Sequence, residues 1–450
     1  MKTILVVDLT HGGSVIALEL SKKKDARVLA WDLYKTLDGE DEDNLKTNGI
    51  ELVDEDFLSE PVDDLMVIAP VHSKLTVPVE LTHHQAVRLI LKNEIDVPII
   101  EVTGVKGKSS TVAILKEIYR HDNPLILSSL GVELVEGEKT TLLLKDISIT
   151  PASIITAWKM ALKNEFQPGI CIFETSLGGT GLAEVGVLTN LAEDYPIARN
   201  SKRASHAKKQ IFQSKKVVCH LKSFNSSYSS IKDFKDKTNT FFLEDEANIT
   251  TSGVEYGIKE TSFTLEIKNL KTIGGELVNT STRMKTFAPG PYHLENVLAA
   301  VGAAFTMGAS EDDVRAGLEG FKGIRGRSSI QESGKVRIVQ EVNPGINLTA
   351  IKKSVAMMAS YGDLVLVLGG QYGVTCEEID EKSLAVFLEG LTEDITLILT
   401  DELGKSLDGK LKRARVYVNY LEDALDLATE LGVANVLLIY RSHFASVEKR

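Results

Sequence analysis

The stretch "VTGVKGKSS", which begins at Val102, holds the residue types that a phosphate-binding loop requires. An apolar run from Val97 leads into it, and a helix-like pattern follows from Thr111. A turn between a strand and a helix points several backbone N–H groups and the positive end of the helix dipole at one place, which suits a phosphate group. Lys108 can reach the outer phosphates, and the Ser109 hydroxyl can bind Mg²⁺. The residues expected to hold the nucleotide are Thr103, Gly104, Lys106, Gly107, Lys108, Ser109 and Ser110.

The spacing of this loop differs from the general nucleotide-loop pattern GxxxxGK[ST]. That pattern places its first glycine where this chain has Val102, and the first glycine stands at Gly104 instead. For a GK[ST] match on its own, a glycine turn followed by a surface lysine is the alternative interpretation. The strand before, the helix after and the second hydroxyl at Ser110 favour the phosphate-binding interpretation.

A second turn between a strand and a helix lies in "VVDLTHGGSVIALEL" near the N-terminus. Its backbone N–H groups could receive an anion, and its glycines would let the backbone approach closely. His11 could orient a substrate or move a proton, because imidazole titrates near neutral pH. An ordinary tight connection in a doubly wound domain is the alternative. The residues expected to contact a substrate here are Thr10, His11, Gly12 and Gly13.

The elements that must position these turns alternate between short apolar runs and amphipathic stretches. "TILVVDL", "ARVLAWDL" and "DLMVIAP" predict strands, and "GSVIALELSKKK" predicts a helix, which is the rhythm of a parallel sheet covered by helices. A doubly wound region therefore ends near residue 95. The Ser-, Thr- and Asn-rich range 223–287 predicts a small antiparallel segment, and the α/β rhythm restarts over residues 329–450.

Composition limits the function classes. A chain of 450 residues exceeds what one core usually supports, so two or three domains are expected. Its 51 basic and 63 acidic residues give a net charge of −12, which argues against broad electrostatic binding to nucleic acid. Anionic ligands must therefore be bound by local features.

The cysteines and the apolar runs bear on the cellular compartment. Cys171, Cys219 and Cys376 lie far apart and form no CxxC pair, so neither a disulfide framework nor a cysteine zinc site is expected. The N-terminus lacks the core of a signal peptide, and nowhere do 18 apolar residues run together. We therefore expect a soluble cytoplasmic protein that does not contact a membrane.

Five motifs, taken in order, resemble those of the Mur ligase family, whose members activate a carboxylate with ATP and usually couple it to an amine. They are "VTGVKGKSS", "FETSLGGTGL", "VLTNLAEDY", "APGPYHLENVLAAVGAA" and "GIRGRSSI". The resemblance implies an α/β fold of three domains and covers most of the chain. It implies a Rossmann-like substrate domain over residues 1–95, a P-loop ATPase-like domain over 96–328 and a C-terminal α/β domain over 329–450.

The family's site residues carry over at several positions. The resemblance makes Lys108 a phosphate ligand, Ser109 a Mg²⁺ ligand and Glu174 the carboxylate of a second metal. A solvated acid at a strand end is the alternative for Glu174. Other expected nucleotide contacts are Asn296 beside the adenine, Arg327 at the domain junction and Glu341 at the ribose.

Two positions depart from the family, and one lysine has a special expected role. Leu294 replaces a family asparagine, and Tyr195 replaces a histidine that helps to hold Mg²⁺, although a neutral tyrosine is a poor ligand for a hard cation. In "SHAKKQIF", Lys208 matches a lysine that reacts with CO₂ to form a carbamate, with Lys209 as its neighbour. A carbamate would supply anionic oxygen to a magnesium site; a run of exposed lysines is the alternative.

The implied chemistry is transfer of the γ-phosphate of ATP to a substrate carboxylate, with Mg²⁺ as the metal cofactor and an acyl phosphate as the product. A narrower resemblance rests on "DLTHGG", "WDLYKTL", Tyr195 and "EVNPGIN". These segments are similar to those of one branch of the family in methanogens. That branch closes a propionate side chain of a nickel tetrapyrrole into a carbocyclic ketone and needs no amine. The alternatives are an amide ligase that joins a carboxylate to an amino acid, and a non-catalytic ATP-binding switch.

Overall fold

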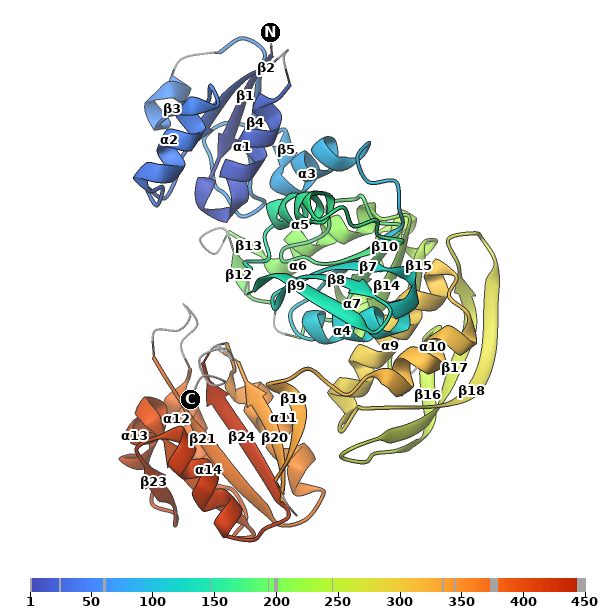
Figure 1. The fold of residues 1–450 in the computed structure, drawn as a ribbon, viewed down its shortest axis with the longest axis vertical. Coiled ribbons are helices and arrows are strands. Elements are labelled where there is room, and N and C mark those ends of the chain that lie inside the picture. Colours follow the sequence, from blue (N-terminus) through green and yellow to red (C-terminus); the bar gives the residue numbers. More distant parts are fainter. Residues whose placement is uncertain are drawn as a thin grey trace. The chain divides into compact units, whose positions relative to one another are not determined.

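The computed structural model describes residues 2–23, 26–59, 62–145, 147–192, 194–197, 201–244, 246–333, 336–343, 345–372 and 379–442. The chain forms two compact units. Unit 1 comprises Met1–Glu255, Ser262–Thr286 and Pro291–Phe321, and unit 2 comprises Tyr256–Thr261, Phe287–Gly290 and Lys322–Arg450. Helices and strands alternate through most of the chain, so the predicted α/β fold is confirmed (Figure 1).

The N-terminal sheet of unit 1 has five parallel strands in the order β3-β2-β1-β4-β5. They are β1 (Lys2–Val7), β2 (Ala26–Trp31), β3 (Glu51–Val53), β4 (Leu65–Ala69) and β5 (Leu81–Thr82). The helices around it are α1 (Ser14–Ser21), α2 (Gly39–Thr47) and α3 (His83–Leu91). Alternate residues of β1 enter two different apolar clusters, with Ile4 and Val6 in one and Leu5 and Val7 in the other. Both faces of this sheet are therefore covered, which explains its uninterrupted apolar strands.

The central sheet of unit 1 has eleven strands in the order β18-β17-β16-β15-β14-β11-β6-β10-β7-β8-β9. Its parallel strands are β6 (Ile99–Thr103), β7 (Pro124–Ser128), β10 (Ile170–Glu174), β11 (Val185–Leu188), β14 (Lys216–His220) and β15 (Thr238–Phe241). Its edges are β8 (Gly131–Glu136) and β9 (Lys139–Lys145) on one side, and β16 (Ile249–Glu255), β17 (Thr261–Lys271) and β18 (Leu277–Thr286) on the other. A separate antiparallel pair consists of β12 (Pro196–Ile197) and β13 (Lys202–Arg203).

Seven α-helices accompany the central sheet among the described residues. They are α4 (Lys108–Ile118), α5 (Ala152–Lys163), α6 (Ala204–Lys208), α7 (Leu221–Ser227), α8 (Lys232–Lys235), α9 (Pro291–Met307) and α10 (Glu311–Gly320). The predicted antiparallel segment over 223–287 is confirmed only for its later part, where β16 and β17 pair antiparallel. The earlier part holds α7, α8 and β15 instead. Asn239 and Phe241 of β15 are buried and β15 pairs in parallel with β14, so this strand belongs to the parallel core.

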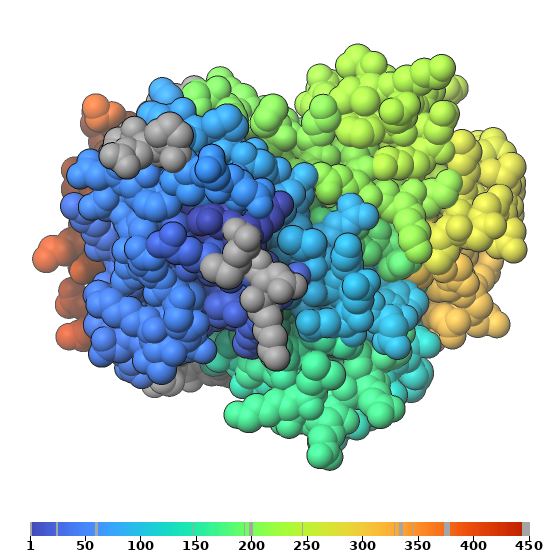
Figure 2. Space-filling view, turned by 90° about the horizontal axis from the view of Figure 1, so that it is seen from above, coloured from blue at the N-terminus to red at the C-terminus, as the bar shows by residue number. Residues whose placement is uncertain are grey.

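One apolar core joins the two sheets of unit 1. Helix α3 contacts α5, and a single cluster of buried residues includes Val87 and Leu91 of α3 together with Ile155 and Trp158 of α5. Figure 2 shows blue residues of the N-terminal sheet directly against the light-blue and green residues that follow. The three large sheets, of five, eleven and six strands, agree with a three-domain architecture, but the first two belong to one compact unit because they share this core.

Unit 2 contains a six-stranded sheet in the order β19-β20-β24-β21-β22-β23, parallel except for β19. The strands are β19 (Arg327–Ser333), β20 (Val336–Val342), β21 (Leu364–Gly370), β22 (Ile395–Thr400), β23 (Val416–Val418) and β24 (Asn435–Arg441). The helices are α11 (Leu348–Ala359), α12 (Glu381–Glu389), α13 (Asp401–Asp408) and α14 (Leu421–Glu430). Helices and strands alternate here, so the α/β rhythm predicted over residues 329–450 is confirmed.

Two further predictions concern residues outside the candidate sites. Cys171 and Cys219 are buried free thiols, and Cys376 lies outside the described residues. None of the helices in the described part of the chain combines the length and the apolar character that crossing a membrane requires.

Candidate active site

The predicted phosphate loop lies between β6, which ends at Thr103, and α4, which begins at Lys108. Gly104 has φ 147° and Gly107 has φ 86°, a region of backbone conformation that favours glycine. A Cβ atom at Gly104 would lie 1.9 Å from the Thr189 hydroxyl, and one at Gly107 would lie 2.0 Å from the Asn296 side-chain oxygen. The shape of the loop therefore requires both glycines, and it places Asn296 of α9 directly beside the loop.

The Thr-Asn segment after β11 holds the loop in place. Because β11 pairs in parallel with β6, both strands end at the same edge of the sheet. The Thr189 hydroxyl and the Asn190 amide both donate hydrogen bonds to the Lys106 carbonyl, at 2.6 and 3.0 Å. The Val105 N–H donates to the Asn190 carbonyl at 3.0 Å. Thr189 and Asn190 thus join the residues predicted from the sequence, and the motif "VLTNLAEDY" contained the signal for them.

Glu174, the last residue of β10, lies beside the first turn of α4. The Ser109 hydroxyl donates to Glu174 Oε2 at 2.9 Å, and the Ser129 N–H donates to the same oxygen at 3.0 Å. Lys108 Nζ lies 4.0 Å from Glu174 Oε1, and the hydroxyls of Ser109 and Ser129 are 3.1 Å apart. Carboxylate and hydroxyl oxygens thus meet at one point near a lysine, and these are the donors that Mg²⁺ prefers. Ser129 is a further residue that the sequence did not point to.

Lys208 is buried, with 1% of its surface exposed, whereas its neighbour Lys209 is exposed. Lys208 Nζ donates to the Ser176 carbonyl at 3.1 Å, and the Thr103 hydroxyl donates to the same carbonyl at 2.5 Å. Burial, assisted by the charge of Lys108, lowers the pKa of Lys208 to about 7. A large share of the Lys208 amine is therefore uncharged near neutral pH, so this lysine is not part of an exposed run.

Tyr195 and Leu294 mark the two departures from the family motifs. The Tyr195 side chain is 40% exposed, and its carbonyl accepts a hydrogen bond from the Ala204 N–H at 2.9 Å. Leu294 is fully buried in α9. Ser110, the second hydroxyl of the loop, lies in the first turn of α4, next to Ser109.

Arg327 and Glu341 belong to unit 2, whereas the phosphate loop belongs to unit 1. They are partners in the antiparallel register of β19 and β20. The Val342 N–H donates to the Gly326 carbonyl at 2.7 Å and fixes this end of the strand pair. The structure thus brings Arg327 and Glu341 together, and their contacts with a nucleotide stay predictions.

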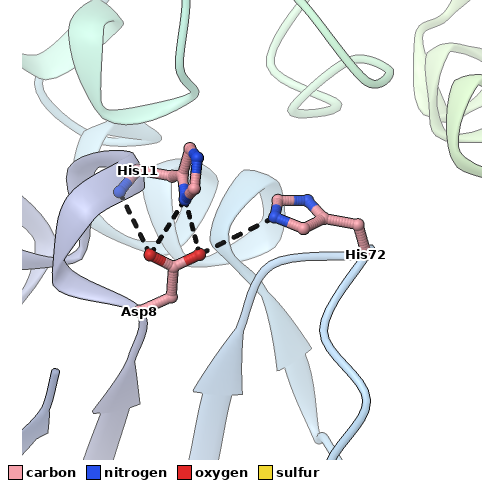
Figure 3. Close-up of side chains that lie close together, drawn as sticks. All are labelled: Asp8, His11 and His72. Atoms are coloured by element: carbon pink, nitrogen blue, oxygen red, sulfur yellow. Dashed lines mark hydrogen bonds and ion pairs between the residues drawn. The ribbon is translucent and has the colours of Figure 1, made fainter. Parts of the chain in front are cut away.

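A second candidate site lies where β1 and β4 end, and it contains Asp8, His11 and His72 (Figure 3). His11 Nδ1 is 2.7 Å from Asp8 Oδ2 and 3.0 Å from Oδ1, and His72 Nε2 is 3.7 Å from Oδ2. Burial alone would raise the pKa of the fully buried Asp8 carboxyl, but the hydrogen bond from His11 and the nearby His72 hold it well below its usual range. The hydrogen bond to Asp8 raises the pKa of His11.

The four predicted substrate residues of this turn have different surroundings. A Cβ atom at Gly12 would lie 2.6 Å from Ala152 Cβ, and one at Gly13 would lie 2.3 Å from the Asp8 carbonyl oxygen, so both glycines serve close packing. Thr10 forms a hydroxyl pair with Thr36. Of the four, only His11 belongs to the cluster with Asp8 and His72.

The backbone of this turn also bears on the expected anion site. The His11 N–H donates to Asp8 Oδ1 at 3.2 Å, so a carboxylate of the chain itself accepts this donor. Asp8 has φ 71°, which turns its side chain back under the helical turn Leu9–Gly13. Asp8 and His72 were absent from our predicted site, since 64 positions separate them and only strand order brings them together.

Known proteins resemble this chain in sequence and in fold. A family profile described as "Coenzyme F430 synthetase CfbE, C-terminal domain" matches residues 330–443. A coenzyme F(430) synthetase of Methanosarcina acetivorans is 29% identical over 97% of this chain and 98% of that protein. One of Methanocaldococcus jannaschii is 27% identical over 90% of this chain and 92% of that protein. The solved MurF ligase of Thermotoga maritima in complex with ADP is 16% identical, with a TM-score of 0.60 over 95% of this chain and 94% of that one.

The fold and these relatives define a class: the chain has the fold of the Mur ligases, and its sequence is similar to synthetases and ligases over most of its length. Within that class, its similarity is to the coenzyme F(430) synthetases, both over nearly the whole chain and in the C-terminal segment that the profile matches.

Proposed function

We propose that the chain uses ATP to activate a propionate carboxylate on a nickel-containing reduced tetrapyrrole and then closes this side chain into a carbocyclic ketone, which gives coenzyme F430. The observation that carries the proposal is the similarity to coenzyme F(430) synthetases over 97% and 90% of this chain. The phosphate loop and the oxygen cluster at Glu174 support the ATP-dependent step.

In the first step, an oxygen of the substrate carboxylate attacks the γ-phosphorus of ATP. The bond to the ADP oxygen breaks, and an acyl phosphate forms. This reaction depends mainly on alignment and charge stabilisation, because the transferred group needs little covalent help. The loop N–H groups and Lys108 hold the phosphates, while Thr189 and Asn190 keep the loop rigid through the Lys106 carbonyl.

Ser109 and Glu174 are the residues proposed to hold Mg²⁺, since their oxygens meet at 2.9 Å beside Lys108. The ion, when bound, neutralises charge on the phosphate groups. Asn296 is proposed to lie by the adenine side of the nucleotide, in keeping with its place beside Gly107.

Lys208 is proposed to carry a carbamate. Its uncharged amine attacks the carbon of CO₂, a nitrogen–carbon bond forms, and one proton is released. The lowered pKa favours this reaction, because only the uncharged amine is a nucleophile. The modified side chain then presents anionic oxygen near Ser176, where the unmodified amine now donates.

In the second step, a carbon of the same macrocycle attacks the acyl carbonyl. A carbon–carbon bond forms, the bond to phosphate breaks, and the attacking carbon loses a proton. Because both reacting groups belong to one bound molecule, the step gains from orientation and needs no second substrate. The net change in the tetrapyrrole is the loss of one water.

Mass analysis of the tetrapyrrole tests this proposal. The purified chain is incubated with ATP, Mg²⁺ and the nickel seco-tetrapyrrole acid, without any amine, and ADP is measured in parallel. We expect a product lighter by one water and one ADP per product formed. ADP formation that requires an added amino acid, with the acid returned unchanged, would instead establish an amide ligase.

A further inference from the structure

The cluster of Asp8, His11 and His72 occupies the position in the N-terminal sheet where ligands usually bind. The chain leaves β1 toward β2 and β3 on one side and returns to β4 on the other, so the strand order reverses between β1 and β4. Ligands of open parallel sheets bind outside the carboxyl ends of the strands at such a switch point. Asp8 directly follows β1, and His72 comes three positions after the end of β4.

The hydrogen bonds of His11 define which of its ring nitrogens can meet a ligand. Nδ1 lies within 3.0 Å of both Asp8 oxygens, so its proton is directed to the carboxylate. Figure 3 shows the other ring nitrogen, Nε2, on the far side of the ring from Asp8. The His11 side chain is 46% exposed and the Asp8 side chain is fully buried. A buried carboxylate that orients an exposed imidazole is the arrangement found behind metal-binding histidines.

Two aromatic rings stand beside His11. The His72 ring meets it edge to face, with centroids 5.3 Å apart, and the Tyr34 ring does so at 5.7 Å. Tyr34 comes shortly after β2 and is 44% exposed. An oriented imidazole thus stands at the carboxyl ends of the strands beside two further rings, of which Tyr34 is partly exposed, and flat rings of this kind can pack against a flat macrocycle.

We propose that His11 Nε2 coordinates divalent nickel, with Asp8 as the positioning residue that holds the imidazole. Imidazole nitrogen is a suitable ligand for this metal. Resting on the proposed function, we assign the nickel to the centre of the tetrapyrrole, whose own nitrogens fill the equatorial positions and leave an axial position for His11.

A free divalent ion is the alternative to the nickel of the tetrapyrrole as the metal bound at this cluster. One ligand atom from each of Asp8, His11 and His72 lies within 4.8 Å of the others, which is close enough for all three to hold one ion. The two sources differ in their need for His72. A free ion would lose a ligand with His72→Ala, whereas an axial bond from His11 would survive that change.

The test uses the full chain without an affinity tag, because a tag of histidines would bind nickel itself. Absorption spectra of the nickel seco-tetrapyrrole are recorded with wild-type protein and with His11→Gly, in the absence of ATP. We expect a change in the nickel-sensitive bands that His11→Gly loses and that added imidazole restores. Asp8→Asn should weaken tetrapyrrole binding, measured by this spectral change, by about 10- to 100-fold. His121→Ala, which removes an exposed histidine elsewhere, is the matched control and should behave as wild type.

A second arm titrates Ni²⁺ alone by calorimetry. Binding lost in both His11→Gly and His72→Ala would support the metal site and assign it to a free ion. Identical spectra and Ni²⁺ isotherms for wild type and His11→Gly would overturn the proposal. The cyclisation assay on the same preparations distinguishes failure of the His11–nickel bond from failure of the proposed function. Turnover with a spectrum that does not depend on His11 refutes the nickel bond alone. Absence of turnover by wild type refutes the proposed function.

Discussion

Replacement of Lys208 by methionine should stabilise unit 1, and the gain should depend on pH. Methionine has a similar length and carries no charge, so it removes the free-energy cost of burying the amine away from water. The pKa of Lys208 is lowered from its ordinary 10.5 to about 7, mainly by burial. A base whose folded pKa is lowered binds fewer protons in the native state than in the unfolded state between these two values.

The magnitude follows from that shift. At about 1.36 kcal/mol per pKa unit, the lysine costs the folded state about 4 kcal/mol at pH 7 and about 2 kcal/mol at pH 9. Loss of the hydrogen bond to the Ser176 carbonyl reduces this gain in stability by about 1 kcal/mol, and that carbonyl keeps the hydrogen bond from the Thr103 hydroxyl. The net gain for Lys208→Met is therefore about 3 kcal/mol at pH 7 and smaller by about 2 kcal/mol at pH 9, because wild-type stability rises with pH over this range.

Urea unfolding followed by tryptophan fluorescence can measure the gain. The chain has two tryptophans, and Trp31 and Trp158 are both buried within unit 1, so the signal reports the unit that holds Lys208. The buffers must be free of CO₂, so that the amine stays unmodified. Lys209→Met is the matched control, since Lys209 is exposed, and its effect should stay within about 0.5 kcal/mol at both pH values.

Two results would refute this reasoning. A gain of the same size at pH 7 and pH 9 would show that Lys208 does not titrate between these values. A loss of stability at both would show that its charged form is well accommodated where it lies.

Three further predictions concern the catalytic step. Lys108→Ala should lower turnover by about 10²- to 10³-fold, because it removes a charge that stabilises the transferring phosphate, while Lys116→Ala on the same helix should stay near wild type; equal rates of ADP formation in the two variants would contradict the loop assignment. Gly104→Ala should destabilise the loop by about 1–3 kcal/mol and raise the KM for ATP, because the new Cβ would meet the Thr189 hydroxyl; an unaltered KM would argue against the loop as the nucleotide site. Lys208→Ala should lose activity that acetate partly restores by supplying oxygen ligands, and full activity without acetate would exclude a catalytic carbamate.

Local sequence patterns predicted most of the fold. The apolar runs of β1, β2, β4 and β6 are fully or largely buried strands, because parallel strands covered on both faces need no polar alternation. The position of the phosphate loop followed from Gly107 and its flanking elements. The family resemblance assigned Ser109 and Glu174 to metal binding. The structure places them side by side, because β6 and β10 are parallel neighbours.

Other features depend on contacts that local patterns do not encode. "SHAKKQIF" could not tell which lysine is buried, because burial of Lys208 depends on the segment after Glu174, which supplies the Ser176 carbonyl. The partnership of Asp8 and His72 depends on β1 and β4 being neighbours, a matter of strand order. The predicted start of the antiparallel segment was wrong, because the polar composition of residues 223–241 gave no indication of the short parallel strand β15.

The apolar core shared by α3 and α5 determines how this enzyme can be recombined with its relatives. Val87 and Leu91 of α3 pack in one cluster with Ile155 and Trp158 of α5, across the position near residue 95 where a module boundary is expected. A chimera that grafts only the first 95 residues onto another ligase would expose this interface and should aggregate or fold poorly. A successful exchange should therefore carry α5 together with the N-terminal sheet.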